Sequence, residues 1–116
     1  MLNLVVIRVA DAEKSKAFYE AIGMRFEKHQ HGKKGLPHFA SVGESASEPV
    51  FEIYPSSGKS TIDTRLGFRV PNVDETLGVL EAQGGAVVSE AKDSPWGRRA
   101  VVKDLDGHKV ELCEAS

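Results

Sequence analysis

The sequence has a single cysteine, Cys113, few aromatic residues, and no long apolar or basic run. One cysteine excludes a disulfide within the chain and is typical of a reducing compartment, so we expect a cytoplasmic protein. The apolar run over residues 2–7 is too short to span a bilayer, and no basic segment precedes it. A net charge of -2, with Lys and Arg dispersed, gives no indication of a nucleic acid or membrane partner.

The 116 residues are enough for one compact unit with a hydrophobic core, or for two very small units that share one core. The first half predicts a strand over residues 2–9, and then a helix that Asp11 caps and Gly23 ends. Three strands are predicted next, over residues 24–29, 38–42 and 50–54. The order is therefore βαβββ.

The same pattern begins again after residue 62, which indicates an internal repeat. Residues 4–26 laid against residues 65–87 pair Arg8 with Arg69 and Gly23 with Gly84. Near the ends of the two copies, residues 51–53 match residues 110–112. We predict one domain built of two modules, with module one over 1–55, a linker over 56–62 and module two over 63–116.

The final stretch, residues 104–114, defines the faces of the last strand. Asp106-Gly107 predicts a hairpin turn, because glycine accepts the positive φ that a tight turn requires. In the strand that follows, side chains alternate between two faces, so Lys109, Glu111 and Cys113 lie on one face. Val110 and Leu112 lie on the other. Glu52 has the same position in module one. Each module is thus predicted to have an apolar face under a helix and a more polar face, and two such faces would enclose a cavity.

These features together resemble the vicinal oxygen chelate superfamily, which includes glyoxalases, bleomycin-resistance proteins and extradiol dioxygenases. The resemblance rests on residues 8–11 and 15–19, on the second opening at 65–84, and on the ending 94–99 with 104–108. It implies an α+β fold with two βαβββ modules in tandem, in which curved mixed sheets enclose a cavity. It further implies a ligand-binding cavity that includes Leu4, Glu52, Arg65, Trp96 and Glu111.

Metal-dependent members take metal ligands from the first and fourth strands of each module. The matching positions here are Leu4, Glu52, Arg65 and Glu111. Leucine has no lone pair to donate, and arginine stays protonated and repels a cation. We therefore predict no metal and no cofactor, with a divalent metal as the alternative. Glu52 and Glu111 are candidate catalytic bases, but they also fit salt-bridge partners, and Arg65 would suit either glutamate.

Several other residues have two interpretations. Trp96 fits a cavity wall that stacks on a flat ligand and fits a lid over the core equally well. His29, His31 and His38 could form a metal site, but their proximity to the turn at residues 32–35 favours a solvated loop. We expect an exposed His108 in the turn.

Cys113 shares the face of Glu111, although a small buried thiol is the usual reason for such a cysteine. Basic residues also fall on faces that can reach the cavity or its rim, namely Arg8, Arg65, Arg69, Arg99, Lys103 and Lys109. They predict an anionic or oxygen-rich ligand.

The sequence thus predicts a small-molecule-binding protein without the usual metal site. The alternative is a divergent lyase, isomerase or dioxygenase of the same superfamily, such as a glyoxalase I-like enzyme, with or without a metal. A single module leaves strand edges and an apolar rim exposed. We therefore expect a homodimer with two equivalent cavities, in which module one of one chain pairs with module two of the other.

Overall fold

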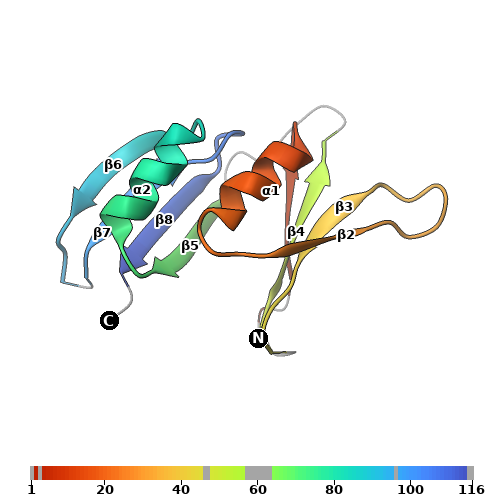
Figure 1. The fold of residues 1–116 in the computed structure, drawn as a ribbon, viewed down its shortest axis with the longest axis horizontal. Helices are drawn as coiled ribbons and strands as arrows, with labels where there is room; N and C mark the ends of the chain where they lie inside the picture. The colour runs from red at the N-terminus through yellow and green to blue at the C-terminus, as the bar shows by residue number, and fades with distance from the viewer. Residues whose placement is uncertain (1, 3, 46–47, 57–63, 96, 115–116) are drawn as a thin grey trace.

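The computed structural model describes residues 2, 4–45, 48–56, 64–95 and 97–114. Within these residues the chain forms two modules that lie side by side along its longest axis (Figure 1). The elements of module one are β1 (Leu4–Val9), α1 (Ala12–Glu20), β2 (Phe26–His29), β3 (His38–Ser41) and β4 (Val50–Pro55). Those of module two are β5 (Arg65–Val70), α2 (Val73–Ala82), β6 (Ala86–Lys92), β7 (Arg99–Lys103) and β8 (Lys109–Glu114).

Each module contains one open, mixed four-stranded sheet. The strand orders are β1-β4-β3-β2 and β5-β8-β7-β6, with a parallel first pair and antiparallel pairs elsewhere. This arrangement confirms the predicted α+β class and the βαβββ repeat. Most of the predicted linker, over 56–62, lies outside the described residues. Neither described helix is both long and apolar enough to cross a bilayer.

Both helices begin at the caps that the sequence indicates. The Asp11 carboxylate accepts a 3.1 Å hydrogen bond from the Lys14 amide, and the Asn72 side chain accepts a 3.0 Å bond from the Glu75 amide. Each cap satisfies a first-turn amide that has no partner within the helix. The helices therefore start at equivalent places in the two modules, and α1 lies between its own sheet and module two (Figure 1).

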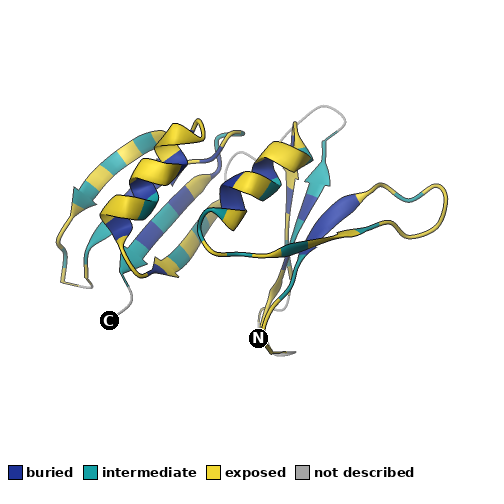
Figure 2. Cartoon of the chain, viewed as in Figure 1, coloured by how far each residue is buried: buried dark blue, intermediate teal, exposed yellow. Residues whose placement is uncertain are grey.

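The core lies between the helices and the apolar face of each sheet. Ile7 and Ile53 of module one are fully buried, as are Val110 and Leu112 of module two, and burial alternates along their strands β1, β4 and β8 (Figure 2). The predicted strand phase is therefore correct. A slip of one residue would have exchanged the two faces and placed the glutamates under the helices.

The two modules of one chain are joined by the turn between β7 and β8. Asp106 in this turn accepts a 2.8 Å hydrogen bond from the Ala10 amide, at the start of module one's helix region. Gly107 has a φ of 97°, as the predicted hairpin requires. The expectation of an exposed His108 is wrong, because this side chain is fully buried and its Nδ1 lies 2.6 Å from the Asp104 carboxylate. The turn thus works as a docking element between the modules.

Candidate functional site

The two glutamates occupy equivalent positions on the faces that the helices do not cover. Glu52 on β4 pairs in register with Val6 on β1, and Glu111 on β8 pairs with Gly67 on β5. Both glutamate side chains are partly exposed, at 19% and 27%. Because residues in register share a face, each glutamate stands at the centre of its module's polar face.

Glu111 is held between arginines from both neighbouring strands. Arg65 on β5 lies 3.5 Å from Glu111 Oε1, which confirms the predicted pairing of Arg65 with one of the glutamates. Arg99 on β7 makes a direct ion pair with the same oxygen. Sequence reasoning placed Arg99 on the cavity rim but missed this contact, because only the β7–β8 register brings Arg99 diagonal to Glu111.

A concavity of about 430 Å³ opens beside this ion-pair cluster. Its lining residues are Gly67, Phe68, Arg69, Arg99, Glu111 and Cys113. Gly67 lines the hollow next to the carboxylate, and a Cβ there would make an ordinary 3.8 Å contact with Glu111 Oε2. Cys113 is half-buried against this hollow, so the expectation of a buried thiol is only partly met.

The face of module two around this concavity is strongly positive. Strand register and alternation place the following basic residues on the face of Glu111: Arg65, Arg69, Arg99, Lys103 and Lys109. Glu111 neutralises only part of this charge. The face can therefore offer several guanidinium donors to an anionic group.

The positions that the family resemblance assigns to metal ligands do not fit a cation in module two. Arg65 stands at the first-strand position and, with Arg99, occupies the carboxylate of Glu111. In module one, Leu4 is 47% exposed and has no donor atom. The donor set that zinc or nickel prefers is thus missing from these four positions.

Glu52 has a different environment, built from β3 and β4. Its Oε2 lies 3.6 Å from His38 Nε2, and the Tyr54 ring stacks on His38 with centroids 4.1 Å apart. Arg8 lies over the Tyr54 ring, 5.3 Å from its centroid. Glu52 therefore contacts an imidazole that stacks on an aromatic ring, whereas Glu111 contacts two guanidinium groups.

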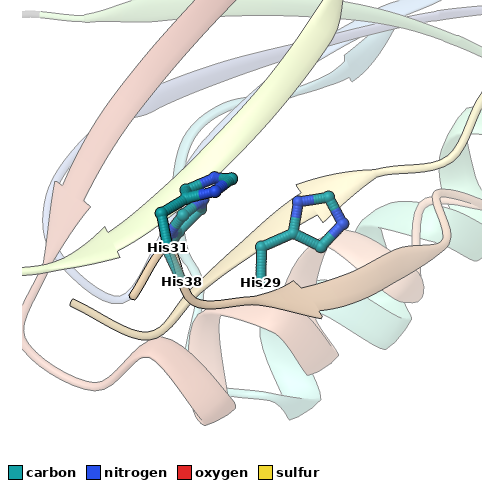
Figure 3. A group of neighbouring side chains, drawn as sticks. All are labelled: His29, His31 and His38. Atoms are coloured by element: carbon teal, nitrogen blue, oxygen red, sulfur yellow. The ribbon is translucent and has the colours of Figure 1, made fainter. Parts of the chain in front are cut away.

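Three histidines lie together (Figure 3), and one of them, His38, contacts Glu52. The expectation of a solvated loop holds for His31, which is exposed, but it is wrong for His38, which is only 2% exposed. His29 at the end of β2 is half-buried. The sequence contained a signal for this cluster. His29 and His31 are two residues apart, and the chain then turns back so that His38 pairs with His29.

Trp96 lies outside the described residues, so its predicted role remains a prediction.

Comparison with known proteins gives a consistent picture. A family model described as the Glyoxalase/Bleomycin resistance protein/Dioxygenase superfamily matches residues 1–112. The chain is 30% identical to a probable lactoylglutathione lyase of Synechocystis, over 96% of this chain and 92% of that protein. It is 31% identical to a lactoylglutathione lyase of Salmonella typhimurium, over 95% of this chain and 89% of that protein.

Solved structures show the same fold. TnmS3, an antibiotic-binding protein from Streptomyces, superposes with a TM-score of 0.70 at 27% identity, over the whole of this chain and 96% of the other. A glyoxalase I mutant from Zea mays gives a TM-score of 0.79 at 21% identity, over 97% of this chain and 46% of that one. At that identity the maize protein indicates fold alone.

Proposed function

The chain belongs to the Glyoxalase/Bleomycin resistance protein/Dioxygenase superfamily, and we propose that it serves there as a small-molecule-binding protein. We propose further that its ligand is anionic or rich in oxygen and binds to the polar face of module two. The observation that carries this proposal is the pair of arginines, Arg65 and Arg99, on the carboxylate of Glu111. Arg65 stands where a metal-dependent relative would need a donor for a cation, and Arg99 joins it on the carboxylate from the neighbouring strand.

The chemistry of the concavity supports an anion. Arg69 and Arg99 both line it, and a guanidinium donates two parallel hydrogen bonds to a carboxylate or phosphate. Glu111 holds Arg99 in place while leaving further donors for a ligand. Such an arrangement binds and orients a ligand without a bound cation. TnmS3 is an antibiotic-binding protein, and its similarity supports the same class of function.

The proposal is tested by calorimetric titration with matched organic acids, neutral amides and amines. We expect binding of the acids alone, and a large loss of affinity in Arg99→Ala. Arg98→Ala is the matched control. Arg98 precedes Arg99 in the chain, but it pairs with Asp74 at 2.6 Å and not with Glu111. Selective binding of amines, or equal loss in both variants, would overturn the proposal.

A lyase or isomerase is the second candidate, and the two lactoylglutathione lyases at 30% and 31% identity favour it. Its general base would be Glu52, because guanidinium groups already occupy Glu111. The assay is hemithioacetal isomerisation with and without added nickel or zinc. If the unmodified protein turns over the hemithioacetal and Glu52→Gln does not, the lyase or isomerase function would take the place of the proposed small-molecule binding.

A further inference from the structure

The polar face of module one carries a group of nitrogen donors that takes no part in the proposed anion site. His29 on β2 pairs in register with His38 on β3, and His31 follows His29 by two residues. Cross-strand partners share a face, and so do residues two apart along an extended chain. One ring nitrogen from each of the three histidines lies within 4.8 Å of the others (Figure 3).

We propose that His29, His31 and His38 form a binding site for a divalent transition-metal ion of the zinc type, with Glu52 as a neighbouring carboxylate. The site differs from the superfamily arrangement, because its three nitrogen donors come from β2, β3 and the segment between them, and only Glu52 on β4 is common to both. All of its donors belong to one module. The proposal therefore does not depend on anion binding at module two.

His38 is oriented as a metal ligand would be. Its Nδ1 lies 3.0 Å from the Leu36 carbonyl oxygen, which can only accept, so the proton is on Nδ1. In the neutral ring the electron pair is then on Nε2, which lies 3.6 Å from Glu52 Oε2. A backbone carbonyl that fixes the tautomer of a ligating histidine is the usual outer support of a metal site.

The surroundings keep this ring in place. His38 is 2% exposed and stacks on Tyr54 with an interplanar angle of 9°. The Tyr54 hydroxyl lies 3.4 Å from Nε2, a long contact that an ion could displace. One donor is thus preorganised on a strand, and the other two approach it from β2 and the adjoining turn.

The other two donors can adjust to the ion. A tetrahedral zinc ion with bonds of about 2.0–2.1 Å separates its ligand atoms by about 3.4 Å. The three nitrogens lie within 4.8 Å of one another, so each pair needs to close by at most about 1.4 Å. His31 is exposed beside Gly32, whose φ of 74° marks the start of the turn. Three imidazoles and one carboxylate suit zinc, cobalt or nickel, and suit calcium or magnesium poorly.

The test is titration of protein without a histidine tag with Zn²⁺ and with Co²⁺, by calorimetry and by the visible spectrum of the cobalt complex. We expect one ion per chain and a tetrahedral cobalt spectrum. His31→Ala should abolish both, and because His31 is exposed this variant should fold normally. Glu52→Gln should weaken binding by about 10- to 100-fold, the usual effect of removing a residue that supports a ligand.

Lys33→Ala, in the same turn, is the matched control and should bind as the unmodified protein does. Substoichiometric binding, or binding that His31→Ala leaves unchanged, would show an adventitious ion only and overturn the proposal. Loss of binding in Glu111→Gln would place the ion on module two and overturn it as well. Neither result would bear on anion binding, which Arg99→Ala tests separately.

Discussion

The Tyr19 hydroxyl on α1 donates a 2.7 Å hydrogen bond to the Asp104 carboxylate in the β7–β8 turn, which joins module one to module two. The same carboxylate also accepts bonds from the ring of His108 and from the amides of Asp106 and His108. Burial of Tyr19, and then its proximity to Asp104, raise the pKa of Tyr19 well above its ordinary value. The phenol therefore stays protonated and serves as a permanent donor.

Removal of this donor should loosen the contact between the modules. We expect Tyr19→Phe to lower the free energy of unfolding by about 1–3 kcal/mol, because a buried carboxylate loses one of its partners. Urea denaturation measures the change. Tyr54→Phe is the matched control and should cost less, since the Tyr54 hydroxyl makes only a 3.4 Å contact. Equal stability of Tyr19→Phe and the unmodified protein would contradict the prediction.

Asp104 should make stability depend on pH in the acid range. Burial acts to raise its pKa, but hydrogen bonds from His108 and Tyr19 outweigh burial, so the pKa of Asp104 is lowered. A carboxyl group whose pKa is lower in the folded protein stabilises the fold at pH values above its unfolded pKa of about 3.9. This stabilisation is lost as the pH falls through the pKa of the folded state. We expect Asp104→Asn to cost about 1–3 kcal/mol at pH 7 and less below about pH 4. Urea denaturation at several pH values measures the difference, and a constant cost would contradict the prediction.

Arg65 and Arg99 should differ in their effect on module two. Arg65 is 51% exposed, and Glu111 keeps Arg99 as a partner when Arg65 is removed. We expect Arg65→Ala to change the free energy of unfolding by less than about 1 kcal/mol, as exposed ion pairs do. Arg65→Ala should also leave the protein without tight metal binding at Glu111, since Arg99 still repels a cation. Denaturation and calorimetric zinc titration of this variant in a His31→Ala background check both outcomes.

The open face of module one should be covered in a homodimer. Leu4, Val6 and Val50 are neighbours on β1 and β4, and each is at least 36% exposed. Light scattering should give a dimer at micromolar concentration, and Leu4→Glu with Val6→Glu should give a monomer. Val79→Glu, on the exposed side of α2, is the control and should stay dimeric. A monomeric unmodified protein would contradict the prediction.

The sequence by itself determined the fold, because the features that carry it are local or periodic. The caps Asp11 and Asn72 act within one turn, and strand alternation fixes the faces of Glu52 and Glu111. The repeat then required both modules to have the same strand order. The charge of the Arg65 side chain also indicated, from the sequence alone, that this position would repel a metal cation.

Tertiary structure decided which side chains meet across strands and modules. Arg99 reaches Glu111 only in the observed β7–β8 register, and His38 becomes a neighbour of Glu52 only when β3 lies beside β4. His108 is buried because its turn docks against α1, more than eighty residues earlier in the chain. Local propensity contains no information on such distant partners, since their contacts depend on how completed elements pack together.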